Sequence, residues 1–329
     1  MAQIVLGIGT SHTPMLNLTA AQWQHRAAAD FANKELNLSD GRRLTYEQLL
    51  AERGPVYEDA ITLELLSKKE HACQASLDKL ADAIEEAAPD VVIIVGDDQA
   101  ELFSHANQPA FAIFNGEAMV THIGKYAEGA PEWLRQVGRG YLMESNYTLP
   151  ASPAFATELI EGLVEHDVDV ASVDAVPDPG KAGFGHAYGF IVKRLFRRSI
   201  PVVPVMLNTY FPPNVPKASR CHDVGAKLRQ VIEASPSKLR VAVVASGGLS
   251  HFIVDEELDR HVMRAFEEND AQALRSIPRN ALKSGSSEIL NWVLAAGAVS
   301  PLKLAWSDYQ PLYRTPAGTG VGAAFCIWK

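Results

Sequence analysis

Three histidines stand in surroundings that suit a functional site. His12 lies in GTSHTP, His186 in GFGHAYGF and His251 in ASGGLSHF, each among glycines and other small residues. Glycine lets the backbone approach a ligand closely, and imidazole serves as a metal ligand and as an acid or base near neutral pH. A structural role is the simpler interpretation of any one of them. Two that follow separate apolar strands, with a third in a glycine loop, together indicate one shared site.

A second group of polar residues follows the apolar run Val91–Val95. The run breaks at Gly96 and continues with Asp97, Asp98 and Gln99. Open α/β sheets build their sites at strand ends of this kind. Two carboxylates and an amide at such a place allow three interpretations: a metal site, an acid/base pair, or a polar exit of the strand into water.

Glu288 is a further candidate, in the segment SGSSEILNWVLAAGA. It falls in the first turn of an apolar helix, where a capping-box glutamate is common, and this segment alone favours that structural role. The functional alternative is a metal carboxylate kept ionised by the helix dipole. Ser250 precedes His251, but no G-x-S-x-G elbow surrounds it, so a serine nucleophile is not indicated.

Short apolar runs must position these residues. They lack polar/apolar alternation, which predicts strands buried on both faces. Helical periodicity fills the segments between them, and this alternation predicts an α/β fold with a central mixed sheet flanked by helices, in one domain over residues 1–329. The predicted strands are 3–11, 90–98, 109–114, 201–208, 240–248 and 320–328, and the predicted helices are 70–88, 152–166, 218–234, 255–269 and 286–298.

Residues 18–66 do not follow the alternation. They are polar and of mainly helical or loop character. We expect them to form a helical insert after the first strand, and to serve as a cover over the site or as a subunit contact.

The composition excludes several classes of protein. The chain has 329 residues and a formal net charge of −9, which argues against nucleic-acid binding. Its three cysteines, Cys73, Cys221 and Cys326, form no CxxC pair, so a disulfide framework or a thiolate zinc site is not expected. We see no signal peptide and no apolar stretch near the ~20 residues of a membrane span. We therefore expect a cytoplasmic protein with no membrane association.

Taken together, these motifs resemble the class III extradiol ring-cleavage dioxygenases of the protocatechuate 4,5-dioxygenase type. TSHTP resembles the segment that carries the family's first iron-ligand histidine, which implies that role for His12. ASGGLSHF is similar to the family's GTGGMSH segment, which implies that His251 is the acid/base. GHAYGF resembles the segment of a second active-site histidine, here His186. SGSSEILNW resembles the segment of the carboxylate ligand, here Glu288.

The resemblance also implies residues near the substrate. NTYFPP resembles a family loop close to the substrate, which suggests that Tyr210 contacts it. Ser250, beside His251, is a second candidate for substrate contact.

The run after Val95 departs from the family pattern. The family has NDHA there, with the second iron-ligand histidine, whereas this chain has DDQA, which places Gln99 at that position. The nearest subgroup, the 3-O-methylgallate dioxygenases, has a similar GDDQ. Gln99 is then a weak neutral ligand, or orients a metal-bound water, or caps the strand; Asp97 or Asp98 as ligand would favour Mn²⁺. We expect this strand to end beside the first strand, Gln99 to face the metal, and at least one aspartate to turn away.

The resemblance implies a function. We expect an Fe(II) enzyme, with Mn²⁺ as the alternative metal, that opens the ring of a catecholic or methoxylated, gallate-type aromatic acid with O₂. We also expect a homo-oligomer. Two alternatives stay open: a binding protein whose metal site has decayed at Gln99, and a metal-dependent hydrolase.

Overall fold

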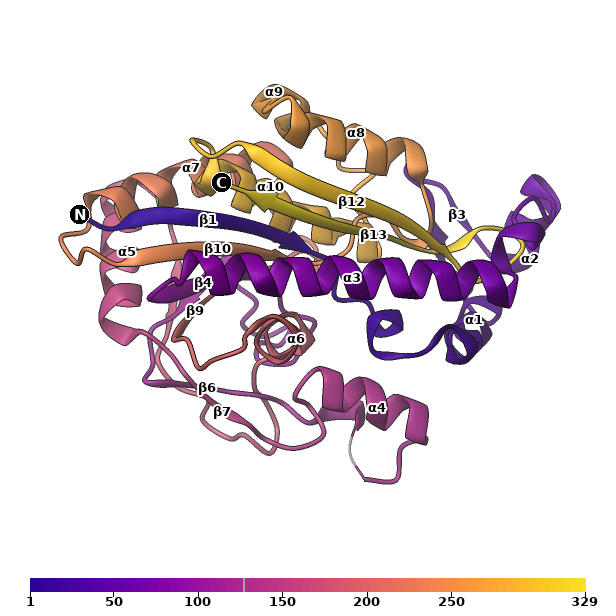
Figure 1. Ribbon diagram of the computed structural model, residues 1–329, viewed down its shortest axis with the longest axis horizontal. Coiled ribbons are helices and arrows are strands. Elements are labelled where there is room, and N and C mark those ends of the chain that lie inside the picture. Colours follow the sequence, from indigo (N-terminus) through magenta and orange to yellow (C-terminus); the bar gives the residue numbers. More distant parts are fainter. Residues whose placement is uncertain (127) are drawn as a thin grey trace.

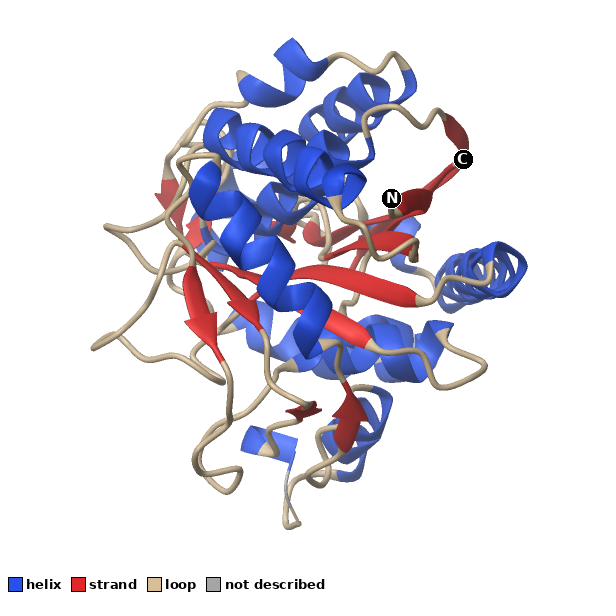
Figure 2. Cartoon of the chain, turned by 90° about the vertical axis from the view of Figure 1, so that its left-hand side faces the viewer, coloured by secondary structure: helices blue, strands red, loops and turns tan. Residues whose placement is uncertain are grey.

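A nine-stranded mixed sheet runs through the centre of the protein, with helices on both of its faces (Figure 1 and Figure 2). The computed structural model describes residues 1–126 and 128–329. The predicted α/β class with a mixed central sheet is confirmed. The strand order is β11 (His251–Ile253), β13 (Thr319–Trp328), β1 (Gln3–Thr10), β10 (Arg240–Ser246), β4 (Val91–Asp97), β9 (Val202–Leu207), β5 (Phe111–Phe114) and β8 (Ala171–Val173), and β12 (Leu304–Tyr313) pairs with β13 outside this row.

The strands β1, β10, β4 and β9 are parallel, so their carboxyl ends meet at one edge of the sheet. β10 lies between β1 and β4. The expectation that β4 ends directly beside β1 is therefore wrong: the exit of β10 separates them. The site at this edge is consequently built from three neighbouring strand exits.

All six predicted strands are present in the central sheet, and its other three strands, β8, β11 and β12, were not predicted. The missed β12 is partly buried along most of its length and contains Pro311. Proline lacks a backbone donor and is confined to sheet edges, so this segment carries a weak strand pattern.

The missing alternation of the predicted strands reflects burial on both faces. In β4, Ile93 and Val95 face one apolar layer, and Val92 and Ile94 face the other. Helices α5 (Pro153–Glu165), α7 (Ala218–Ala234), α8 (Glu256–Glu267), α9 (Ala271–Arg275) and α10 (Ile289–Val299) contribute to the first layer, and α3 (Leu63–Ala87), α4 (Glu132–Gly140) and α6 (His186–Leu195) to the second.

Several helices differ from prediction: α4 and α9 were not predicted, α10 begins at Ile289 rather than at Ser286, and two further differences bear on the site. α3 begins at Leu63 rather than at Glu70, because Thr62 caps it by accepting a hydrogen bond from the backbone N–H of Leu65. Its first turns are largely exposed and therefore carry no apolar period. α6 was not predicted, although it begins at His186 and fixes that residue at its N-terminus.

α10 approaches the sheet closely because of a glycine. A Cβ at Gly9 of β1 would lie 2.1 Å from the indole ring of Trp292, a residue of α10. Only glycine therefore lets this helix lie against the end of β1. The contact fixes the position of the 3-10 helix η5 (Ser284–Glu288), which leads into α10.

The predicted insert, residues 18–66, packs on the β11–β13 end of the sheet. It holds η2 (Ala20–Gln22), α1 (Gln24–Phe31), β2 (Leu36–Asn37), β3 (Arg43–Leu44), α2 (Tyr46–Arg53), η3 (Glu58–Ile61) and the start of α3. A small apolar cluster joins Leu36, Tyr46 and Leu49 to Ile253 and Ala317. The insert thus lies against the strand that begins with His251.

The remaining short elements are η1 (Pro14–Asn17), β6 (Ala118–Val120), η4 (Gly124–Tyr126) and β7 (Thr148–Pro150). Within the described ranges, no helix is both long enough and apolar enough to span a bilayer.

Candidate active site

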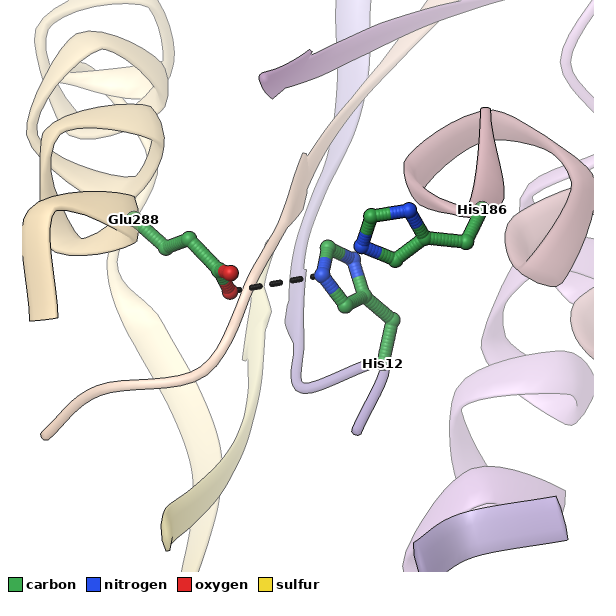
Figure 3. A group of neighbouring side chains, drawn as sticks. All are labelled: His12, His186 and Glu288. Atoms are coloured by element: carbon green, nitrogen blue, oxygen red, sulfur yellow. Dashed lines mark ion pairs between the residues drawn. The ribbon is translucent and has the colours of Figure 1, made fainter. Parts of the chain in front are cut away.

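The side chains of His12, His186 and Glu288 point toward one another from three different elements (Figure 3). His12 follows β1, His186 opens α6, and Glu288 ends η5. One ligand atom from each lies within 4.8 Å of the other two. His12 and Glu288 are 2% exposed, whereas His186 is partly buried.

A serine fixes the tautomer of His12. The Ser246 hydroxyl donates to the carbonyl of Ala187 at 2.6 Å, so it can only accept from His12 Nδ1 at 2.9 Å. Nδ1 therefore carries the proton, and the lone pair of Nε2 points toward Glu288, 3.3 Å from its Oε2. The Tyr141 hydroxyl donates to the carbonyl of His12 at 2.6 Å and holds its backbone.

His186 is oriented by a carboxylate. Its Nδ1 lies 2.8 Å from Oε1 of Glu101, so Nδ1 is the donor and Nε2 faces the group. Burial would lower the pKa of His186, but the charges of Glu101, Asp97 and Glu288 outweigh it and raise the pKa to about 9. The same negative charges favour a divalent cation at this position.

Glu288 does not cap its helix. It stands at the N-cap of α10, but no side-chain capping bond forms there. Instead its Oε2 accepts the backbone N–H of Gly248 at 2.8 Å. Burial alone would raise the pKa of Glu288, but positive charge on the His251 and His12 rings lowers it to about 2. A cation bound between these side chains would act in the same direction and keep the carboxylate ionised. The capping-box interpretation of Glu288 is therefore wrong.

His251 stands on the other side of the same carboxylate. Its Nδ1 donates to the carbonyl of Leu249 at 2.9 Å, which leaves the lone pair of Nε2 directed at Glu288, 3.4 Å from Oε2. Burial lowers the pKa of His251 more than the charge of Glu288 raises it. A Cβ at Gly248 would lie 2.3 Å from the ring, so glycine is needed for the ring to take this position.

The residues after β4 divide into two sets. Asp98 turns away from the group and accepts the backbone N–H of Ala100, Leu102 and Phe103 at 2.8 to 3.2 Å. It thereby shapes the loop and holds Ala100 at a positive φ of 66°. Asp98 is thus a loop-forming residue, as one aspartate of the pair was expected to be.

Asp97 and Gln99 face the group. The Gln99 amide nitrogen lies 3.0 Å from Asp97 Oδ2 and 3.4 Å from both His186 Nε2 and Glu288 Oε1. A half-turn of this amide would present its oxygen in the same direction. Asp97 is fully buried, and burial together with the charge of Glu288 raises its pKa to about 6. Asp97 therefore holds the amide of Gln99 beside His186 and Glu288.

The two predicted substrate contacts have different positions. Tyr210 lines the cavity described below, and its hydroxyl donates to Glu288 Oε1 at 3.3 Å. Ser250 is 1% exposed and faces away from the cavity: its hydroxyl donates to Asp259 Oδ2 at 2.7 Å and accepts the N–H of Asp255 at 2.9 Å. The structure does not support a substrate contact for Ser250, because both sides of its hydroxyl are bonded to protein.

A cavity of about 320 Å³ opens above these side chains. His12, Gln99, His186, His251 and Glu288 form one side of it, which we call the donor side. Arg26, His122, Lys125 and Arg314 also line it; Arg314 is paired with Asp30, and we call the other three the cationic side. Apolar and aromatic walls complete it, formed by Leu134, Val137, Tyr141, Met143 and Phe252.

Comparison with known proteins gives the family. Residues 60–323 match the family described as the catalytic LigB subunit of aromatic ring-opening dioxygenase. The chain belongs to the LigB family. The match includes β4, β10, α6 and α10, and therefore four of the five donor-side residues; His12 and most of the insert precede it.

Curated relatives agree with the LigB family. Gallate dioxygenase of Pseudomonas putida is 31% identical over 112 residues, which is 31% of this chain and 32% of that enzyme. A 2,3-dihydroxyphenylpropionate/2,3-dihydroxicinnamic acid 1,2-dioxygenase of Comamonas testosteroni is 25% identical over 170 residues, which is 51% of this chain and 45% of that enzyme. The matched chain thus spans less than half of the length of either relative.

LigB dioxygenases are metal-dependent, and the donor side fits a metal ion. Nε2 of His12 is buried and has no hydrogen-bond partner among the described residues. An unpaired buried nitrogen is costly unless something outside the protein chain binds it. Two imidazole nitrogens and one carboxylate form the donor set that suits Fe(II) and related divalent metals, and metal binding would displace the proton from His186.

Several residues that shape the site were missed from the sequence. Glu101 and Ser246 orient the two histidines, and the third acid in DDQAE and the serine ending VVAS are the signals that could have found them. No sequence signal indicated Arg26, because it lies in a polar helix of the insert.

Proposed function

We propose that this LigB-family protein is a metal-dependent extradiol dioxygenase that opens the ring of a catecholic or gallate-type aromatic acid with O₂. The observation that carries the proposal is the convergence of three differently positioned ligand atoms, all turned inward, at the end of a cavity with aromatic and apolar walls. The family match supports the reaction type, and the gallate dioxygenase relative supports the substrate class.

We place the metal on His12, Glu288 and His186, with Gln99 beside it. In this arrangement His186 supplies the second histidine that the family motif lacks at Gln99. The Glu101 carboxylate on its Nδ1 is the usual partner of a metal-ligating histidine. Fe(II), or Mn²⁺ in its place, would supply Lewis acidity toward two vicinal ring oxygens and the redox chemistry with O₂.

His251 is the acid/base in this proposal. Its proton is held on Nδ1 by the carbonyl of Leu249, so Nε2 is free to accept a phenolic proton from the substrate. Burial lowers the pKa of His251, which keeps the ring neutral and ready as a base. The protonated ring would then return the proton to the product.

The walls have a separate role. Tyr141, Met143 and Phe252 offer flat or apolar surface to an aromatic ring and displace water from it. Tyr210 lies against Glu288, on the donor side, where its hydroxyl can reach an oxygen substituent of the ring.

The test is anaerobic reconstitution with Fe(II), and separately with Mn²⁺, followed by an oxygen-electrode screen of gallate, 3-O-methylgallate and protocatechuate. We expect O₂ uptake with at least one of them, in equal amount to the ring-opened product. Stoichiometric metal without O₂ uptake on any of these compounds would contradict the proposal. Conversion without O₂ would instead indicate a hydrolase, and a protein that binds neither metal would indicate a binding protein with a decayed site.

A further inference from the structure

Two arginines line the same cavity but differ in their partners. Arg314 is buried and makes a two-pronged ion pair with Asp30, with nitrogen to oxygen distances of 2.7 and 3.0 Å. Arg26 is half-buried, and no ion pair of Arg26 occurs within residues 1–126 and 128–329. Its Nε is buried without any hydrogen-bond partner there.

Arg26 does not pair with Asp30, the acidic residue one helical turn away. Arg26 and Asp30 are four residues apart on α1, a spacing that brings side chains together on one helix face. Asp30, however, is engaged by Arg314 and also accepts the Thr319 hydroxyl at 2.7 Å. Both carboxylate oxygens of Asp30 therefore bind residues at the β12–β13 connection. The guanidinium of Arg26 lines the cavity without this partner.

Other basic groups surround the same end of the cavity. Nδ1 of His122 is buried without a partner in the described part of the chain. Lys125 lines the cavity as well: burial lowers its pKa, the charge of Arg26 lowers it further, and the Glu101 carboxylate, which also lines the cavity, opposes both. Arg26 and Lys125 are like charges that repel one another, so an anion bound between them would lower this repulsion.

We infer that the cationic side is a subsite for an anionic substituent of the aromatic substrate, with Arg26 from the insert as its main contact. This rests on the proposed function, because it gives the substrate an orientation within that same cavity. In this proposal the vicinal ring oxygens lie against the donor side, and a ring carboxylate reaches Arg26. A guanidinium binds a carboxylate through two parallel hydrogen bonds, so it selects the acid over the neutral phenol.

The test compares gallate with pyrogallol, which keeps the three vicinal hydroxyls and lacks the carboxylate. Arg26→Met should raise the dissociation constant of gallate on the anaerobic, metal-loaded protein on the order of 10- to 100-fold, the usual effect of losing hydrogen bonds to a charged group. It should leave pyrogallol binding within a factor of about two, because uncharged contacts are unchanged. Tryptophan fluorescence measures both without turnover, and kcat/KM for the two compounds should show the same selectivity.

Two variants control this experiment. Arg43→Met removes an exposed arginine of the same insert and should change neither constant. Arg26→Lys keeps the charge and loses the planar fork, so it should restore part of the gallate affinity. Equal losses for gallate and pyrogallol, or an unchanged affinity for gallate, would overturn the inference. If the protein binds no metal, the proposed function fails, while titration of the protein as purified with gallate still tests the anionic subsite.

Discussion

The donor side and the cationic side of the cavity differ in how their polar atoms are used. On the donor side, each of His12, His186 and His251 has its Nδ1 bonded to protein, and the remaining nitrogen of each faces inward. On the cationic side, Arg26 and His122 carry buried nitrogens for which the described residues supply no partner.

The two sides also differ in how far they can vary without disturbing the central sheet. The donor side comes from strand ends and helix starts of the central sheet, so its geometry changes only if the sheet changes. The basic residues come from the insert, from η4 and from the loop before it, which can vary without disturbing the sheet. One half of the cavity therefore suits the reaction, and the other half suits the choice of substrate.

The largest effect is expected from removing a ligand on the donor side. His12→Ala and Glu288→Ala should each abolish stoichiometric metal binding and reduce turnover to background, because each supplies one of three protein donors. Metal analysis after gel filtration measures the loss, and circular dichroism should show an unchanged fold. Glu268→Ala, at an exposed glutamate, is the matched control. If both ligand variants retain stoichiometric metal, the donor side is misassigned.

The next effect concerns His251, the donor-side residue that we assign to proton transfer rather than to the metal. His251→Phe should keep metal and substrate binding but lower kcat by ~10²–10⁴-fold, the usual range for a general acid/base. Metal content, substrate affinity and O₂ uptake measured on one preparation separate these properties. Near-normal turnover would assign the proton transfer elsewhere, with His186 as the first candidate.

A third prediction tests how the insert is held over the cavity. Asp30 and Arg314 are buried, at 4% and 5% side-chain exposure. Asp30→Asn should lower the free energy of unfolding by about 3–5 kcal/mol, the usual cost of leaving one buried partner unpaired. Urea denaturation measures this cost. Asp40→Asn, in an exposed pair of the same insert, should leave stability unchanged. Equal stability of the two variants would mean that the ion pair does not anchor the insert.

The smallest effect is expected at Gln99. If His186 is the third ligand, Gln99→Ala should weaken metal binding by roughly 10- to 100-fold, as outer-shell substitutions do, and His186→Ala should weaken it more. Gln99→His should tighten binding, because it adds an imidazole beside the other donors. Metal titration with a competing chelator ranks the variants. A greater loss in Gln99→Ala than in His186→Ala would make Gln99 the ligand.

Strands and candidate site residues were predictable from the sequence, whereas the contacts that orient those residues were not. β4 was predictable because an unbroken apolar run such as Val91–Val95 suits a strand buried on both faces. The histidines were recognisable from the glycines around them. The hydrogen bonds that orient them were not, because Ser246 lies 234 positions from His12 and Glu101 lies 85 from His186.

The orientations of the polar side chains in DDQA were predictable only in part. The sequence requires that Asp97, Asp98 and Gln99 cannot all face one point, and the loop turns Asp98 away. Which aspartate turns away depends on the three backbone N–H groups that gather around Asp98, and this follows from the turn at Ala100 rather than from the motif. Arg26 was beyond prediction, since its environment depends on how Asp30 pairs with Arg314 across the fold.

The position of β1 has a consequence for the synthesis of the protein. β1 precedes His12, yet it lies in the interior of the sheet between β10 and β13. The Ser11 hydroxyl accepts the N–H of Ala324, 313 positions further along the chain. At ribosomal rates of about 5–20 residues per second, β13 is synthesised roughly 15 to 60 seconds after β1. Until then the apolar β1 segment of the nascent chain lacks its neighbour β13. The segment around His12 can take its final conformation only after β13 has been synthesised.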